Sequence, residues 1–197
     1  PEVLSLMGKA ILQFHRGAPA DAEAHMLGAR KVAVALASPG GAGKVGEDLL
    51  TFVDSLLMII VMGGGRDAEA LQYAETVSVR LDEAASAAPR DGSAVAFAAA
   101  THAIKAFAAL RLGRAEQAAG STVRAEQMLE LIAPNLKDED QATILQTAFL
   151  VLALYHRGTG DVGRAERYLE RSIALAEEAV KSGRAYFQVY LDLANAY

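Results

Sequence analysis

The stretch Gly113-Arg114-Ala115-Glu116-Gln117-Ala118 decides the fold, because its glycine and its last alanine return at a nearly constant distance along the chain. The glycines stand 48, 48 and 47 residues apart, and an alanine follows each of them after five residues. The pairs are Gly17 and Ala22, Gly65 and Ala70, Gly113 and Ala118, and Gly160 and Ala165. A fixed period of tens of residues is the signature of a stacked repeat array. We therefore predict a repeat protein.

Two further positions of each period hold mostly small residues. Seven residues before each glycine stand Ala10, Met58, Ala106 and Ala153, and seven after each alanine stand Ala29, Val77, Ala125 and Ser172. Small side chains are expected where the two helices of a hairpin, and the next hairpin along, approach closely. The spacing thus indicates pairs of helices that nest against their neighbours.

The residues between these landmarks favour helices over strands. Ala, Leu, Glu, Arg and Gln dominate, and Tyr168, Leu169, Ile173 and Ala176 recur at steps of three and four residues. Prolines at positions 39, 89 and 134 separate the periods, and the glycine marks a second break inside each period. Every period therefore holds an A helix, a short turn and a B helix.

This pattern predicts an all-α, right-handed superhelix of about four and a half antiparallel hairpins. We expect A helices near 3–15, 47–62, 93–111, 139–157 and 185–197, and B helices near 19–37, 66–87, 114–133 and 162–181. One domain would span 1–197, with repeats at about 3–38, 47–88, 93–134 and 139–182 and a half repeat at 185–197. Because the chain starts at Pro1 and stops at Tyr197 inside an apolar pattern, we interpret it as a segment of a longer protein.

Composition excludes several classes of function. The chain has 197 residues, 52% of them hydrophobic, and a net charge of −5, which argues against disorder and against a strongly basic nucleic-acid surface. It contains no cysteine, so disulfides and thiolate chemistry are excluded, and we expect a cytoplasmic, reducing location. The apolar run at 49–62 carries Asp54 and ends in glycines, which favours a buried helix over a membrane span.

The last quarter of the chain resembles the tetratricopeptide repeat. Its pattern reads Phe149-x-x-Leu152-Ala153, then Gly160-Asp161-x-x-x-Ala165-x-x-x-Leu169-x-x-Ser172, and finally Tyr190-x-x-Leu193-Ala194-x-x-Tyr197. In that family the A helix carries an aromatic, a leucine and a small residue, and an alanine opens the B helix. In the earlier repeats Leu6, Asp54 and His102 replace the aromatic. The period is longer than the ~34 residues of a tetratricopeptide unit, which indicates a long-helix variant.

The resemblance implies a binding role and no enzymatic activity. Tetratricopeptide arrays hold a peptide, a partner helix or a small ligand against a concave wall formed by their A helices. The wall residues that would contact a partner here are Phe14, Phe52, Ile59, Met62, Phe107, Leu110, Leu150, Leu154, Arg157, Gln188 and Asn195. The same faces carry Met7, Ser55, Ala100 and Ala103. This wall is mostly apolar, so it is either buried core or a groove for an amphipathic helix or an apolar ligand.

Three uses of the wall remain open. The first is a scaffold that binds a protein or peptide. The second is the ligand-sensing and assembly segment of a regulator that resembles the MalT-like bacterial transcriptional regulators. The third is a structural array that forms a homodimer. We expect no cofactor, no metal, no membrane and no catalytic residue, and the acidic balance disfavours nucleic acid as a partner.

Other candidate motifs have structural explanations. The stretch Ser38-Pro39-Gly40-Gly41-Ala42-Gly43-Lys44-Val45 lacks the first glycine and the final Ser or Thr of a phosphate-binding loop, and it follows a helix. His15 and His156 end A helices, where we expect them to cap terminal carbonyls. Arginines near the A–B turns predict a solvated edge or a basic rim: Arg16, Arg66, Arg111, Arg114, Arg157 and Arg164.

Overall fold

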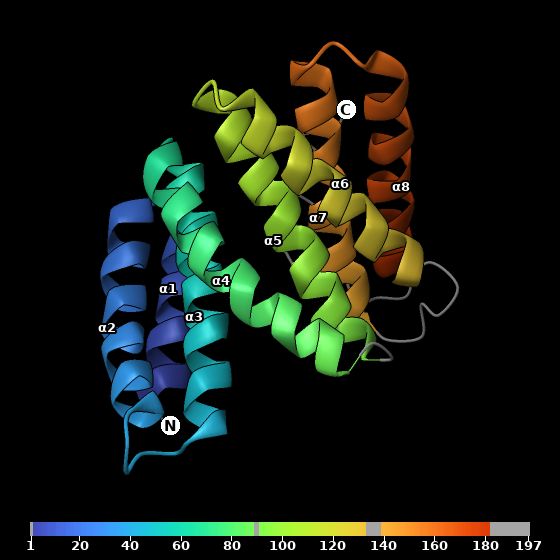
Figure 1. Ribbon diagram of the computed structural model, residues 1–197. Helices are drawn as coiled ribbons and strands as arrows, with labels where there is room; N and C mark the ends of the chain where they lie inside the picture. The colour runs from blue at the N-terminus through green and yellow to red at the C-terminus, as the bar shows by residue number, and fades with distance from the viewer. Residues whose placement is uncertain (1, 89–90, 133–138, 182–197) are drawn as a thin grey trace. The chain divides into compact units, whose positions relative to one another are not determined.

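The computed structural model describes residues 2–88, 91–132 and 139–181, which form eight α-helices joined by short connections (Figure 1). The helices are α1 (Glu2–His15), α2 (Pro19–Ala37), α3 (Lys44–Gly63), α4 (Asp67–Ala87), α5 (Gly92–Arg111), α6 (Ala115–Ile132), α7 (Glu139–Gly158) and α8 (Val162–Lys181). No strand occurs in the described residues. The protein is therefore all-α, as predicted.

The helix positions agree closely with those expected from the sequence. The largest difference lies at the start of α3, which begins at Lys44 instead of near residue 47. The break at Pro39 falls in the loop between α2 and α3, so the glycine-rich stretch does follow a helix. The expected breaks at residues 89 and 134 and the expected helix at 185–197 lie outside the described residues.

The four repeated glycines adopt one backbone conformation. Their φ angles are +74° at Gly17, +75° at Gly65, +73° at Gly113 and +82° at Gly160. At Gly113 the amide donates to the Leu110 carbonyl at 2.9 Å, and the next amide, of Arg114, donates to the Ala109 carbonyl at 2.8 Å. This pair of bonds is the Schellman ending of a helix, which requires a left-handed residue. The same two bonds form at all four glycines.

The repeated small positions lie in the packed interior. The alanine five residues after each glycine donates its amide to the residue that follows the glycine, and so begins the hydrogen bonding of the next helix. Of the twelve small positions singled out in the sequence, all are buried except Ala165, which is half-buried. The constant turn and the small residues thus explain the period, because both are needed wherever one helix reverses onto the next.

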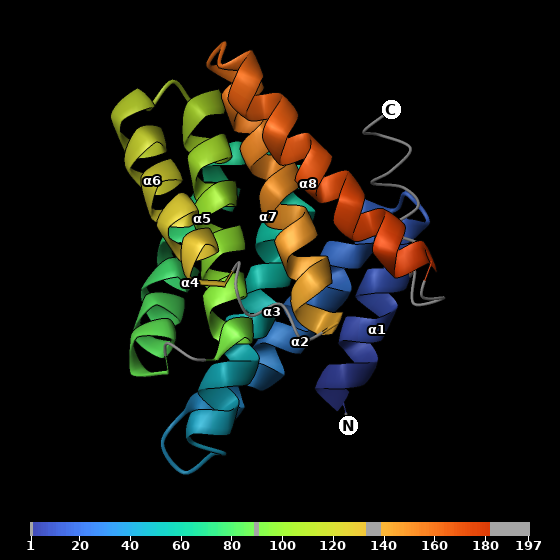
Figure 2. The ribbon, with the colours of Figure 1, turned by 90° about the vertical axis from the view of Figure 1, so that its right-hand side faces the viewer.

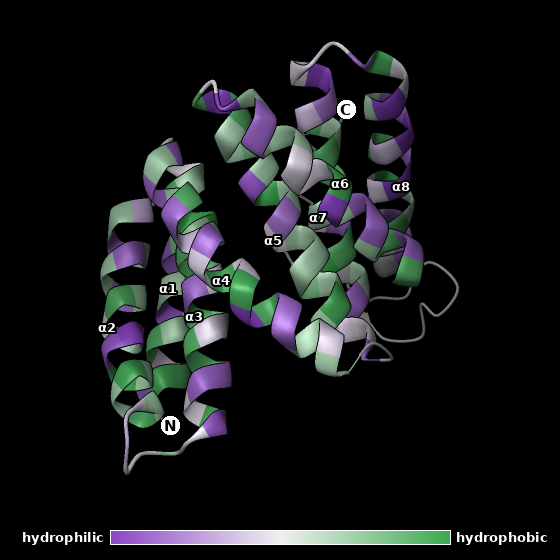
Figure 3. Cartoon of the chain, viewed as in Figure 1, coloured by the Kyte–Doolittle hydropathy of each residue, from purple (hydrophilic) through white to green (hydrophobic). Residues whose placement is uncertain are grey.

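The chain divides into two compact units, Pro1–Val77 and Ser78–Tyr197, and α4 supplies residues to both. In the first unit α2 packs against α1 and α3 around a core that includes Met26 and Leu57. Gly46 lets α3 start against the end of α2, since a β-carbon at Gly46 would lie 2.4 Å from the Leu36 carbonyl carbon. Figure 3 shows apolar and polar segments alternating along α2.

In the second unit α5 packs against α6 on one side and α7 on the other, and α7 packs against α8 (Figure 2). At the start of α5, a β-carbon on Gly92 would lie 2.8 Å from the Gln141 amide nitrogen of α7. At its end, Leu110 reaches the position of a β-carbon on Gly158 at 2.9 Å. Helices α5 and α7 therefore run parallel along their whole lengths.

Helix α5 is the apolar centre of the second unit. Ala96, Ala99 and Ala103 are fully buried on one face of it, and Ala98 is fully buried on the opposite face. It is the one described helix that is long and apolar enough to cross a membrane, and 67% of its apolar window is buried inside the protein, as in the core helix of a soluble domain.

The two units join consecutive hairpins in different ways. In the first unit the B helix α2 carries the main contact with α3, whereas in the second unit the A helices α5 and α7 lie side by side. The right-handed superhelix of about four and a half hairpins, and its continuity as a single domain over 1–197, stay predictions.

Candidate functional site

Four of the expected wall residues belong to the first unit. Phe14 of α1 is half-buried on the core, and a β-carbon on Gly63 of α3 would lie 3.2 Å from its ring. Ile59 and Met62 of α3 are half-buried, and Phe52 is 39% exposed. The structure thus brings Phe14 to the end of α3, while Phe52 lies more than two helical turns earlier on the same helix.

Five wall residues belong to the second unit. Phe107 and Leu110 of α5 and Leu150 of α7 are half-buried, Leu154 is 39% exposed, and Arg157 is exposed. Because Leu110 contacts the Gly158 position, the last turns of α5 and α7 lie together, and Leu154 is one turn away on the Gly158 face. The last two wall residues, Gln188 and Asn195, lie outside the described residues.

Four side chains on the faces that were expected to form the wall are buried. Met7 and Ser55 are buried in the first unit, and Ala100 and Ala103 are buried in the second. Of the two alternatives for the wall, buried core or groove, these four side chains are buried core, because each packs inside its own unit. In the second unit the accessible part of the wall comprises Phe107, Leu110, Leu150, Leu154 and Arg157, and we call it the α5–α7 wall.

Two arginines lie at one end of this wall. The guanidinium carbon of Arg111 lies 5.7 Å from the centre of the Phe107 ring, which is a cation–π distance. Arg111 and Arg157 both lie in the last turn of their helices, where positive charge also favours the helix dipole. The wall is therefore apolar along its length and basic at one end.

A second group of residues, which sequence reasoning missed, lies where a B helix meets the A helix of the next hairpin. In the first unit the Arg30 guanidinium of α2 donates to the Asp54 carboxylate of α3 at 2.6 Å. Asp54 is only 1% exposed, and it replaces the aromatic of the repeat pattern. The hydrogen bond to Asp54 raises the pKa of Arg30, so the guanidinium keeps its positive charge.

The second contact of this kind joins α4 to α5. The His102 ring places Nε2 3.1 and 3.2 Å from the two carboxylate oxygens of Asp82. His102 is 6% exposed, and it also replaces the aromatic of the pattern. Arg124 of α6 lies 3.6 Å from the same carboxylate. A polar cluster therefore links three helices inside the second unit.

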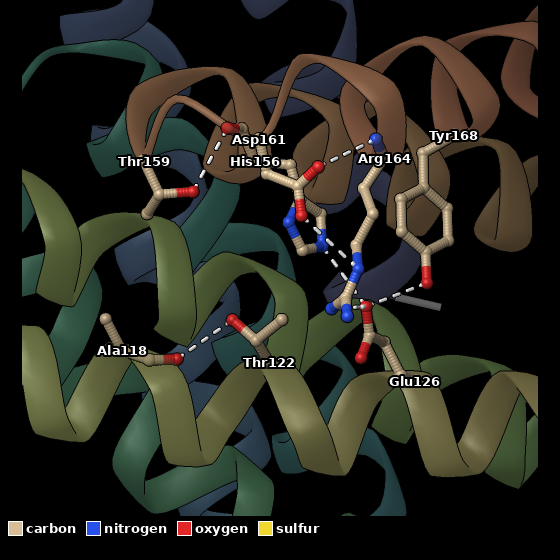
Figure 4. Close-up of polar contacts among 8 residues, drawn as sticks. All are labelled: Ala118, Thr122, Glu126, His156, Thr159, Asp161, Arg164 and Tyr168. Carbon is tan, nitrogen blue, oxygen red and sulfur yellow. Dashed lines mark hydrogen bonds and ion pairs between the residues drawn. The ribbon is translucent and has the colours of Figure 1, made fainter.

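The third contact centres on Glu126 of α6 (Figure 4). Its carboxylate accepts hydrogen bonds from Nε2 of His156 at 3.1 Å and from the Tyr168 hydroxyl at 2.9 Å. Arg164 lies 3.7 Å from the same oxygen. The His156 and Tyr168 rings stack with their centres 5.4 Å apart, and Tyr168 in turn stacks on Phe149.

This arrangement corrects one prediction. His156 was expected to cap the end of α7, but its side chain is buried, 4% exposed, and faces Glu126 on another helix. Burial, together with the hydrogen bond to Glu126, raises the pKa of Tyr168, so the hydroxyl stays protonated and donates. Glu126 is thus engaged by groups from α7 and α8, and it holds these helices to α6. The side chain of His15 lies outside the described residues.

Two of the arginines near the A–B turns form ion pairs with acidic residues. Arg66, which immediately precedes α4, pairs with Glu69 of α4 and with Glu23 of α2. Arg164 pairs with Asp161 at 3.3 Å as well as with Glu126. These pairs support the interpretation of a solvated, locally neutralised edge. Within residues 2–88, 91–132 and 139–181, no three His, Asp or Glu side chains are placed to hold a metal ion.

Comparison with known proteins adds no family to these observations, since no protein-family model, curated protein or solved structure matches the chain. The likeness to the tetratricopeptide repeat therefore depends on the residues of the chain themselves. The α5–α7 wall is therefore the candidate binding site, and the polar contacts join consecutive hairpins within each unit.

Proposed function

We propose that the chain is a non-catalytic, tetratricopeptide-like scaffold that binds an amphipathic helix or peptide of a partner protein through the α5–α7 wall. One observation supports this function above the others. Leu150 and Leu154 lie one helical turn apart on α7, and neither is buried, whereas Leu145 and Leu152 on the same helix are. An apolar stripe at this spacing matches the i, i+4 anchors with which helices recognise each other.

The neighbouring residues favour a protein partner. Leu110 extends the stripe onto α5, so the accessible apolar surface spans two parallel helices. A surface two helices wide offers a groove in which a third helix can lie, because side chains of the ligand fit between the two rows. Arg157 and Arg111 at the end of the wall would meet acidic residues of the ligand.

The test uses helical peptides as probes. A displayed library of amphipathic helical peptides is selected against the whole chain, and the selected peptide is measured by isothermal titration calorimetry. We expect Leu154→Glu to weaken binding by at least about tenfold, or ~1.4 kcal/mol, because it puts a charge into the apolar stripe. Phe107→Glu should act in the same way on α5. The far-ultraviolet circular dichroism spectra of both variants should remain those of a helical protein.

A matched control lies on a B helix. Leu131 of α6 is 63% exposed and does not belong to the wall, so Leu131→Glu should leave the affinity unchanged. The proposal fails if no helical peptide binds, or if the selected peptide binds the Leu154→Glu and Phe107→Glu variants as tightly as the unaltered chain.

A further inference from the structure

The His102 side chain is ionisable and buried, and one of its two ring nitrogens makes no hydrogen bond to the described residues. Its Nε2 faces the Asp82 carboxylate, which can only accept, so Nε2 carries the proton of the neutral ring. Its Nδ1 is buried and has no hydrogen-bond partner in the described part of the chain. A second proton would therefore create a donor, Nδ1–H, in a position where no described group accepts it.

The charges around the ring are mixed. Asp82 of α4 faces Nε2 and favours the protonated ring, whereas Arg124 of α6 and Lys105 of α5 disfavour it. Helix α7 also packs on α5, and its described basic side chains, His156 and Arg157, lie in its last turn. Burial is the largest influence, and it lowers the pKa of His102 below its usual 6.5 in spite of Asp82.

We propose that His102 is an acid-sensitive latch between α4 and α5. At neutral pH the uncharged ring holds residues 78–87 of α4 through Asp82. On acidification the ring gains its second proton most readily when α4 has moved away and water reaches Nδ1. Acid therefore favours a state in which this part of α4 is released from α5. Because α4 belongs to both units, release would alter the helix that runs from one unit into the other.

The direction of the effect follows from linkage. The open or unfolded form binds the proton near pH 6.5, and the closed form binds it only at lower pH, so the latch contributes its full stability above pH 6.5. That contribution is lost as the pH falls from 6.5 through the pKa of the closed form. Between pH 7.5 and 5.5, the equilibrium constant for opening should rise by up to about tenfold from this one group.

The experiment measures hydrogen exchange of the backbone amides of residues 78–87 in the whole chain at pH 7.5 and 5.5, corrected for the intrinsic exchange rate. The unaltered chain should show the rise in opening. His102→Gln keeps an amide that can donate to Asp82 but cannot ionise, so its rise should be clearly smaller. His25→Gln, which alters a half-buried histidine of α2 in the first unit, should behave like the unaltered chain.

A second measurement needs no variant. The ring resonances of His102 are titrated by nuclear magnetic resonance, and the expected midpoint lies below that of a free histidine. The proposal is overturned if His102→Gln shows the same rise in opening as the unaltered chain. It is also overturned if His102 in the native protein titrates at or above pH 6.5.

Discussion

Gly113→Ala tests the repeated turn that defines the period. For a residue with a β-carbon, the left-handed conformation that Gly113 has at φ +73° costs about 1–2 kcal/mol. The substitution also makes the unfolded chain less flexible, which offsets about 0.4–1 kcal/mol of this cost. No atom lies within 4 Å of a β-carbon placed on Gly113, so no steric cost is added. The net loss in the free energy of unfolding should be about 1 kcal/mol, measured by urea denaturation, with a fall in Tm of about 2–4 °C.

A glycine on the next helix provides the control. Gly120 of α6 also has open space around a β-carbon, but its φ is not positive. Gly120→Ala should therefore stabilise the protein by about 0.5–1 kcal/mol, since alanine is the better helix former. The two alanine substitutions should thus have opposite signs. If Gly113→Ala stabilised the protein as Gly120→Ala does, the explanation of the period by left-handed turns would be refuted.

Two further substitutions test the packing. Ala153→Leu should lower the free energy of unfolding by about 1–3 kcal/mol through overpacking, and Ala165→Leu should cost less because Ala165 is only half-buried; urea denaturation that shows no loss for Ala153→Leu would count against the helix register. Arg30→Met should cost about 1–3 kcal/mol because the buried carboxylate of Asp54 loses its guanidinium partner. The double variant Arg30→Met/Asp54→Leu should recover most of that loss, and a double variant as unstable as the single one would contradict the pairing.

The helices could be predicted from the sequence because their limits are set by backbone geometry that every hairpin shares. A helix that ends in a left-handed residue needs glycine there, and Gly17, Gly65, Gly113 and Gly160 therefore recur. A close approach between helices needs a small side chain, which explains why Ala10, Ala22 and their equivalents recur in step. Such requirements are identical in each hairpin, and so they appear as a period.

The contacts between hairpins could not be predicted in this way. Arg30 and Asp54 are 24 residues apart, Asp82 and His102 are 20 apart, and Glu126 and His156 are 30 apart. These separations differ because the partners occupy different turns of their helices, and no periodic signal results. The one available hint was that Asp54 and His102 stand where the repeat pattern has an aromatic, since a buried polar residue needs a partner nearby.

The accessible wall was predicted only in part, for a related reason. A helix face that is apolar at three- and four-residue spacing can be covered or open, and the sequence of one helix does not distinguish the two. Ala100 and Ala103 are buried, whereas Leu150 and Leu154, on the equivalent face of α7, are not. Which turn of a helix is covered depends on where the neighbouring helices end, and that is a property of the packed unit.

In the contacts between hairpins, the placement of acid and base restricts which hairpin can follow which, and the shared turns impose no such restriction. In the first unit the acid is on the A helix, as Asp54, and the base is on the B helix, as Arg30. In the second unit the order is reversed, because the A helices carry His102 and His156 and the acids lie on α4 and α6. Asp54 and His102 occupy the same place relative to their glycines, eleven residues before Gly65 and Gly113 respectively. Packing α5 on α2 in place of α3 would therefore set His102 against Arg30, and Arg30 would lose its carboxylate partner. Small residues alone would allow any hairpin to follow any other, and the unlike polar pairs penalise the wrong order.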